Sequence, residues 1–289
     1  MFKNSIKTTA LLAALGGLIV GVAAVLGGGS SGAVMIGLAI ALVMVGGSYW
    51  FSDKLALKSA RAVVVTEADA PEFYRMVAAL ARRANMPMPR VAISPAEQPN
   101  AFATGRGPNN AVVCATQGLI RSLSAEELEG VMAHELMHVR NRDILIGSVA
   151  AAVATAISAI AQMAYFASLF GGGRQDDDRP NPIALLMISM LAPISASVIQ
   201  MAISRSREFE ADRSAAELLG SGRSLAQALQ KIEKLAERIP MNVQPAQAQA
   251  YIHNPLAGLR NQRGGGLNMS KLFSTHPSTE ERIRRLLSM

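Results

Sequence analysis

Apolar and charged positions are unevenly distributed along the chain, and four stretches carry no charged residue. Each stretch is long enough to cross a bilayer, which takes about 20 apolar residues in a helix. The four are Thr8 to Leu26, Ala33 to Phe51, Ile144 to Phe170 and Ile183 to Ser204. This pattern predicts four transmembrane helices, arranged as two hairpins.

Two of these stretches admit a second interpretation. Lys3 and Lys7 precede the first stretch as they would in a cleaved secretory signal. The short glycine-rich turn over 27–32 favours a retained hairpin instead. Pro193 and Gln200 interrupt the fourth stretch, which indicates either a tolerated kink or a helix partly buried in protein. We favour the retained hairpin and the kink.

Basic residues near the four stretches indicate their orientation. Lys and Arg in short flanking segments are held on the cytoplasmic side of a membrane. The residues that mark this side are Lys3, Lys7, Lys54, Lys58, Arg61, Arg140, Arg142, Arg205 and Arg207. Both termini and both polar segments of the chain are therefore expected in the cytoplasm.

The polar segments show the periodicities of short strands and amphipathic helices. The strands expected are Arg61 to Val65, Arg90 to Ile93 and Ala111 to Ala115. The helices expected are Ala70 to Ala84, Ser124 to Arg142, Glu208 to Leu219 and Leu225 to Arg238. The fold class is therefore α+β and mostly helical, combined with the four transmembrane helices.

One expected helix carries the motif H-E-x-x-H. Its start is independent of the motif, because Ser124 followed by Glu127 matches a capping box. His134 and His138 are four residues apart and lie on one face, so that both can bind a single zinc ion. Glu135 can accept a proton from a water at the open position of the metal. In a chain with only four histidines, this arrangement favours hydrolase chemistry over a chance match.

A catalytic zinc usually takes three protein ligands, so a third must come from elsewhere. Glu208 and Asp212 are also four residues apart on one face of an expected helix. Glu208 can be the third ligand, and Asp212 can hydrogen-bond the free ring nitrogen of a ligating histidine. Taken alone, this segment is typical of a solvated, charged helix start. Two imidazoles and one carboxylate suit Zn²⁺, so we expect one zinc ion per chain.

Because the metal needs both polar segments, they are expected to fold together. We divide the chain into a transmembrane hairpin, 1–52, and a cytoplasmic catalytic part with the H-E-x-x-H helix, 53–143. A second transmembrane hairpin, 144–204, and a second catalytic part with the third ligand, 205–289, follow. The second hairpin brings the two ligand-bearing helices to the same side of the membrane.

Charge and cysteine content exclude other classes. The net charge of +7 is spread along the chain and partly explained by the membrane flanks. A lipid bilayer is therefore the expected partner, and nucleic acid is not. Cys114 is the only cysteine, so no intramolecular disulfide forms and a thiol protease is disfavoured.

H-E-L-M-H, the later E-F-E-A-D, the four spans and the segment Pro99 to Gly105 together resemble the HtpX family of bacterial heat-shock membrane metalloproteases. The likeness covers essentially the whole chain. It implies a zincin-like catalytic domain on the cytoplasmic face of the inner membrane. It also implies an endopeptidase that cuts unfolded or misfolded membrane proteins in quality control and stress response, and that cleaves itself on solubilisation. The family's zinc ligands fall on His134, His138 and Glu208, with Glu135 as catalytic acid and base and Asp212 behind the ligands.

The resemblance also implies a substrate-pairing edge strand near Asn100 to Thr104, with Asn100, Ala101 and Phe102 as substrate-binding residues. An extended peptide would add its backbone to the sheet there, whatever its detailed sequence. From the residues alone, this segment is a loop or a short strand.

His276 and Arg282 resemble part of a C-terminal motif of related membrane metalloproteases. The resemblance implies that His276 acts in catalysis and that Arg282 supports the developing oxyanion. Ser278 stands where that motif often has a second proline. A turn leading into a helix with solvent-facing arginines is an equally good interpretation of the residues.

Two other function classes stay open. Prenyl-protein proteases share these motifs, but they are usually built with more membrane spans. An inactive membrane scaffold would be expected to lack Glu135 or one metal ligand, whereas this sequence retains all of them.

Overall fold

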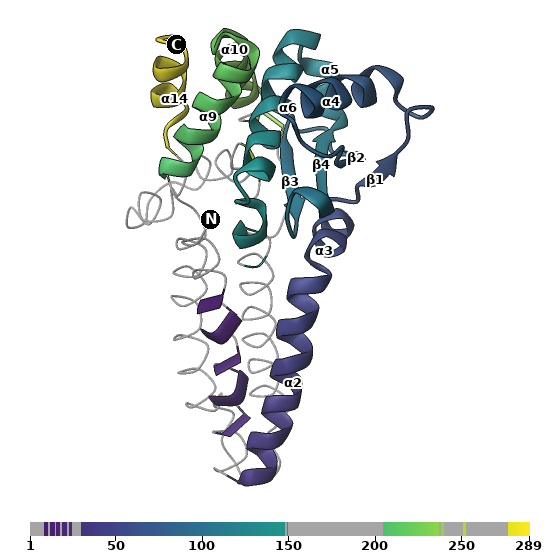
Figure 1. Ribbon diagram of the computed structural model, residues 1–289, viewed down its shortest axis with the longest axis vertical. Helices are drawn as coiled ribbons and strands as arrows, with labels where there is room; N and C mark the ends of the chain where they lie inside the picture. The colour runs from purple at the N-terminus through teal and green to yellow at the C-terminus, as the bar shows by residue number, and fades with distance from the viewer. Residues whose placement is uncertain are drawn as a thin grey trace, which may run out of the picture.

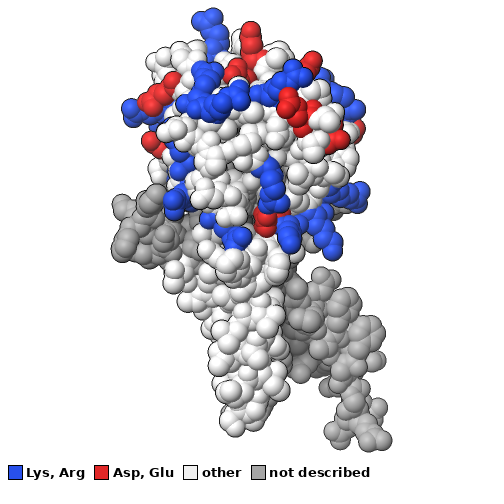
Figure 2. Space-filling model, turned by 45° about the vertical axis from the view of Figure 1, so that its right-hand side comes forward, with Lys and Arg blue, Asp and Glu red and all other residues white. Residues whose placement is uncertain are grey.

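The computed structural model describes residues 30–147, 149, 205–236, 238–239, 251–252 and 277–289, together with scattered positions between 9 and 24. Helix α2, Ser31–Trp50, extends away from a head that contains the sheet and the other helices (Figure 1). Helix α3, Ser52–Ser59, leads from α2 into the head. Charged side chains cover the head, whereas the narrow extension below it shows none (Figure 2). A helix over most of the stretch from Ala33 to Phe51 is confirmed, whereas its transmembrane placement stays a prediction.

The other apolar stretches are described only in part. The described positions between 9 and 24 are helical, and so are residues 144–147. The rest of the second predicted hairpin, up to Ser204, lies outside the described residues. In the part of the chain that the structure describes, no single helix is long and apolar enough to span a membrane. Val34–Gly47 and Ser52–Ser59, which meet at a bend of 73°, satisfy the length and composition required when taken together.

One mixed sheet lies in the head, with the strand order β1-β2-β4-β3. The strands are β1, Val63–Val65; β2, Arg90–Ser94; β3, Ala101–Gly105; and β4, Ala111–Thr116. Strands β2 and β4 are parallel, whereas β1 and β3 run antiparallel to their neighbours. The central strand β4 is buried at every position, as its apolar run predicts. Strand β3 forms one edge of the sheet.

The other helices of the head lie above the sheet and to its left in Figure 1. They are α4, Pro71–Arg83; α5, Gln117–Ser122; α6, Ala125–Arg140; α9, Arg205–Leu219; α10, Arg223–Ala236; and α14, Thr279–Leu286. A 3-10 turn, η1, spans Pro108–Asn110 between β3 and β4. The mostly helical α+β fold and the positions of four predicted helices and three predicted strands are confirmed.

Some element ends differ from the prediction because the backbone turns there. Arg61, Asn85 and Arg142 have φ values of 50°, 53° and 58°, in the left-handed region that neither strands nor right-handed helices use. The first strand therefore starts at Val63 rather than Arg61. Helix α6 ends at Arg140, two residues before the predicted end.

Helix α6 lies at the centre of the head and packs against α4, α9, α10 and β3. Its middle is buried on all sides, so Val131, Met132, Leu136 and Met137 are all inaccessible to solvent. The hydrophobic core around α6 contains residues that precede position 147 in the chain as well as residues of α9, α10 and α14. The two polar segments of the chain therefore share one hydrophobic core.

Candidate metal centre

Helix α6 presents His134, Glu135 and His138 from a rigid position. Its first turn is fixed by the predicted capping box, in which the Glu127 backbone N–H donates to Ser124 Oγ at 3.3 Å. In return, the Ser124 backbone N–H donates to Glu127 Oε2 at 2.9 Å. Because the helix is buried on all sides, the two histidines cannot change their relative position without disturbing the core.

Helix α9 brings Glu208 and Asp212 to the same place. The two carboxylates are four residues apart, and both are buried. The alternative interpretation, a solvated helix start, is therefore wrong for these two residues. Glu210, which lies between them, is exposed, as expected from the helical period.

Ligand atoms of three residues converge between α6 and α9. Nε2 of His138 lies 3.1 Å from Nε2 of His134 and 3.5 Å from Oε1 of Glu208. Nε2 of His134 lies 3.8 Å from Oε2 of Glu208. Ligand atoms bound tetrahedrally at zinc distances are separated by about 3.4 Å. The observed separations bracket this value, so the donor set fits zinc in both chemistry and size.

Each histidine has a carboxylate at its second ring nitrogen. Nδ1 of His134 lies 2.9 Å from Oδ1 of Asp212, and Nδ1 of His138 lies 3.4 Å from Oδ2 of Asp143. These contacts favour the tautomer that leaves Nε2 free to bind a metal. Burial, followed by the nearby Arg282 charge, lowers the pKa of His134 and so favours the neutral ring that ligation requires.

Arg282 closes the site from α14. Its guanidinium donates from Nε and Nη2 to the two carboxylate oxygens of Asp212, at 2.8 and 2.7 Å. Burial alone would raise the pKa of Asp212, but the Arg282 charge and hydrogen bonds lower it to about 2. Ser278 is the N-cap of α14 and accepts from the Glu281 backbone N–H at 3.2 Å. Ser278, which stands where related motifs often have proline, therefore has a structural role as a helix cap.

Arg282 does not face solvent, because only 2% of its surface is exposed. Its Nη2 lies 3.4 Å from the ring nitrogens of His134, and its Nη1 lies 3.8 Å from Oε2 of Glu208. The turn-and-solvent interpretation of this arginine is therefore wrong. The guanidinium instead holds Asp212 beside the metal ligands and places a fixed positive charge within the site.

Glu135 lies between the two histidines on α6 and is 3% exposed. Burial raises the pKa of its carboxyl to about 7. The carboxylate accepts a hydrogen bond from the backbone N–H of Ala103 on strand β3. A carboxyl with a pKa near neutrality can both accept and donate a proton at a pH near 7.

The other predicted site residues lie at the start of β3. Asn100, Ala101 and Phe102 are buried, and the Asn100 side-chain oxygen accepts from the Ala101 N–H at 3.1 Å. The Ala101 carbonyl accepts from the backbone N–H of Ile252 at 3.0 Å. His276 lies outside the described residues.

Sequence reasoning missed three contributors to this site. Asp143 lies three residues beyond the end of α6, and the left-handed turn at Arg142 returns it toward His138. The backbone N–H of Ala103 and the segment Tyr251–Ile252 carry no motif that would have identified them. Of these three contributors, only Asp143 had a signal in the sequence, namely a carboxylate just beyond the end of the helix that carries the histidines.

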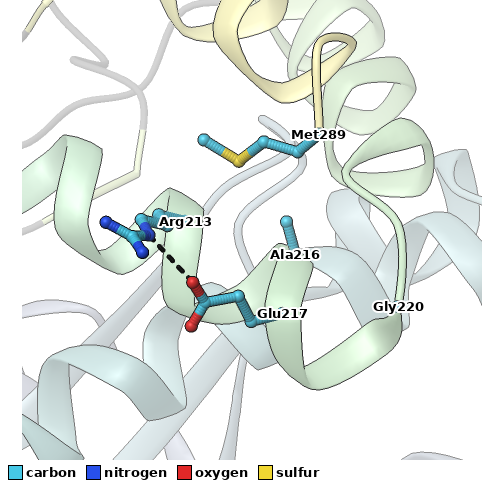
Figure 3. A pocket seen from close by; sticks show the side chains of 5 residues that line it. All are labelled: Arg213, Ala216, Glu217, Gly220 and Met289. Atoms are coloured by element: carbon cyan, nitrogen blue, oxygen red, sulfur yellow. Dashed lines mark hydrogen bonds and ion pairs between the residues drawn. The ribbon is translucent and has the colours of Figure 1, made fainter.

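A separate pocket of about 300 Å³ lies by the last turns of α9 and the C-terminus (Figure 3). Arg213, Ala216, Glu217, Gly220 and Met289 line it. Arg213 and Glu217 form an ion pair of 2.8 Å across its wall. None of the metal ligands reaches this pocket, so it does not belong to the metal centre.

The fold and the three ligands define a zinc metallopeptidase of the H-E-x-x-H class whose third ligand comes from a second helix. The model of peptidase family M48 matches residues 67–289, and the chain belongs to this family. It is 52% identical over 290 residues to relatives described as "Protease HtpX homolog", from Burkholderia mallei (strain SAVP1) and Burkholderia pseudomallei (strain K96243). These alignments cover 99% of this chain and 97% of each relative.

Among solved structures, the chain resembles one described as "Crystal Structure of S. mikatae Ste24p", with a TM-score of 0.50 and 19% identity. The alignment covers 99% of this chain and 66% of that chain. At this identity the likeness concerns the fold alone. The predicted HtpX-family resemblance and the zinc ligands His134, His138 and Glu208 are confirmed.

Proposed function

We propose that this zinc metallopeptidase is a membrane-integrated endopeptidase that cuts misfolded or damaged membrane proteins. It acts at the cytoplasmic face of the bacterial inner membrane, in protein quality control and the stress response. The observation that carries the peptidase chemistry is the convergence of His134, His138 and Glu208, with Glu135 in the adjacent position on the same helix.

Each site residue then has a role. When bound, zinc supplies a Lewis acid that polarises the scissile carbonyl and lowers the pKa of water. Glu135 takes a proton from the attacking water and passes it to the leaving amine, which its near-neutral pKa supports. Asp212 orients His134. Arg282, with His276, supports the negative charge that develops on the carbonyl oxygen.

The edge strand β3 would bind the substrate backbone. Its neighbour on one side is β4, and its other side faces the Glu135 carboxylate through the Ala103 N–H. A peptide extended along this edge would therefore pass beside the metal ligands. Recognition through backbone hydrogen bonds suits unfolded chains of varied sequence. Asn100, Ala101 and Phe102 belong to the proposed substrate strand.

The membrane location is supported by the sequence pattern and by α2. This helix has no charged residue over Ser31–Trp50 and exposes Met35, Ile36, Leu42 and Val43. Large apolar side chains exposed in such numbers require a nonpolar environment. We infer four transmembrane helices, with 1–52 and 144–204 as hairpins that hold the two catalytic parts at the bilayer surface.

The proposal is tested with the full chain purified in detergent with chelator, followed by addition of zinc. Cleavage of casein is followed on a gel for the wild type, for Glu135→Gln, and for Glu129→Gln as a control on an outer face of α6. We expect zinc-dependent cleavage by the wild type and the control, and a loss of at least about 100-fold in Glu135→Gln. Equal cleavage by Glu135→Gln would contradict the assigned role of Glu135.

The same preparations test the other function classes. Cleavage of a prenylated peptide but not of casein would favour a prenyl-protein protease. Zinc binding without cleavage of either substrate would favour a scaffold. Self-cleavage should appear as Glu135-dependent fragments of the chain itself when zinc is added.

A further inference from the structure

The junction between α2 and the head exposes apolar side chains together with basic ones. Trp50 ends α2 and is 59% exposed, and Phe51 and Leu55 are each 51% exposed. The charge-free surface of α2 gives way here to Lys54 and Lys58, which are also exposed. Figure 2 shows basic side chains gathered along the rim of the head beside the narrow extension. Aromatic rings and basic side chains are both favoured at the level of lipid headgroups.

Helix α3 has the geometry of a helix that lies on a bilayer. It meets α2 at a bend of 73°, so with α2 across the bilayer α3 lies nearly along the bilayer surface. Leu57 and Ala60 pack in a core cluster with residues of the sheet, whereas Lys54, Leu55 and Lys58 are exposed. A helix of this kind places its apolar side chains below the headgroups, while its lysines extend to the phosphates.

Arg106 joins this surface from a distant part of the sequence. It follows the end of β3, and its Cζ atom lies 4.4 Å from the centroid of the Trp50 ring. A guanidinium stacked on an indole in this way can still donate its N–H groups to a phosphate. The rule for basic residues that flank membrane spans does not account for Arg106, because no apolar stretch lies near it in the sequence.

The positive charge of this surface is not balanced by nearby acids. Asp53 is the only acidic residue of α3, and it pairs with Arg90 of β2. Within the part of the chain that the structure describes, no carboxylate forms an ion pair with Lys54, Lys58 or Arg106. The surface therefore complements an anionic partner.

We propose a binding surface for anionic phospholipids, the neck surface, formed by Trp50, Phe51, Lys54, Leu55, Lys58 and Arg106. The three basic side chains bind the lipid phosphates, and the three apolar ones enter the bilayer boundary beside them. The end of β3 is thereby held at the bilayer surface, next to the place where a membrane-protein substrate would leave the bilayer. This proposal rests on the membrane location proposed above.

The test uses the fluorescence of Trp50, which is the only tryptophan of the chain. The full chain, kept free of metal to prevent self-cleavage, is reconstituted in vesicles that contain phosphatidylcholine and phosphatidylglycerol. One of the two lipids carries bromine on its acyl chains, and bromine quenches an indole on contact. The two degrees of quenching give the relative binding constant of the two lipids. We expect the wild type to prefer phosphatidylglycerol at least about fivefold, and to lose this preference at high salt.

Two combined variants isolate the charge of the neck surface. One joins Lys54→Gln, Lys58→Gln and Arg106→Gln, and should bind both lipids equally. The other joins Lys54→Arg, Lys58→Arg and Arg106→Lys, and should keep the wild-type preference. Each binding ratio is taken within one protein, so a change in Trp50 emission caused by the loss of Arg106 cancels.

A matched control removes three exposed basic residues from the far side of the head. Helices α4 and α10 lie there, away from α2 (Figure 1). The control combines Arg82→Gln, Arg223→Gln and Lys234→Gln. Its preference for phosphatidylglycerol should equal that of the wild type, because these charges lie away from the bilayer.

The outcomes separate this proposal from the membrane location on which it rests. Equal binding of the two lipids by the wild type overturns the neck surface and leaves the membrane location standing. A preference that the glutamine variant retains, or that the charge-conserving variant or the control loses, also overturns the neck surface. Absence of quenching by either brominated lipid overturns the membrane location itself.

Discussion

At the scale of single residues, the site depends on carboxylates that touch the histidines rather than the metal. Asp212 is paired with a buried guanidinium, so its position is fixed from two sides. Asp143 has a looser contact, 3.4 Å from Nδ1 of His138, and lies in the turn after α6. The two ligating histidines are therefore supported to different degrees.

Replacing Asp143 with Asn should weaken zinc binding by about tenfold, because His138 loses the charged partner that orients its ring. The dissociation constant is measured by competition with a chromophoric chelator. Asp69→Asn is the control, since Asp69 hydrogen-bonds Thr66 in the turn before α4 and has no contact with the site. Equal affinities for Asp143→Asn and wild type would show that the turn does not support the ligand.

At the scale of elements, α6 is positioned by a close approach to α10. A Cβ at Gly130 would lie 2.8 Å from the backbone nitrogen of Leu225 and 3.1 Å from Ser224 Oγ. Only glycine permits this spacing, so the contact fixes α6 against the start of α10.

Gly130→Ala should therefore destabilise the protein by about 1–2 kcal/mol, although alanine ordinarily favours a helix by roughly 1 kcal/mol. The free energy of unfolding is measured by urea titration of the metal-free protein. Gly147→Ala provides the comparison, because a Cβ there meets nothing within 4 Å. A stabilised Gly130→Ala protein would mean that α10 can shift without cost.

The start of α6 is also the origin of a pH dependence. Burial alone would raise the pKa of Glu127, but hydrogen bonds from Lys231 and Ser124 outweigh it and lower the pKa. Lys231 Nζ lies 2.7 Å from Glu127 Oε2, which joins α10 to the first turn of α6. A lowered pKa in the folded state stabilises it above the ordinary carboxyl pKa, and this contribution is lost as pH falls through the folded-state value.

Glu127→Gln should therefore be less stable than the wild type at about pH 7, and the difference should be smaller at about pH 3. Chemical unfolding of the metal-free protein at both pH values measures the difference. Glu126→Gln, an exposed change in the same turn, should not alter the slope of stability with pH. A Glu127→Gln deficit that persists undiminished in acid would exclude this origin.

At the scale of the whole molecule, local patterns predicted much of the fold and of the metal centre. Ser124 with Glu127 and the histidine spacing depend on neighbours within one helix, so α6 could be predicted without tertiary information. Glu208 could be paired with those histidines because zinc requires a third ligand. The contact of Ile252 with Ala101 could not be predicted, because it depends on how a segment about 150 residues away packs on a sheet edge.

Zinc binding should stabilise the whole head, because its ligands come from α6 and α9 on either side of the segment 144–204. A ligand that binds only the folded state at 100 times its Kd adds about 2.7 kcal/mol to the free energy of unfolding. We therefore expect a higher Tm in detergent with zinc than with chelator, measured by intrinsic fluorescence. In Glu208→Gln, which loses a charged ligand, zinc should raise the Tm much less. A rise in Tm of equal size in that variant would place the stabilising metal elsewhere. If zinc does not change the Tm of the wild type, α6 and α9 are held together by the shared core alone.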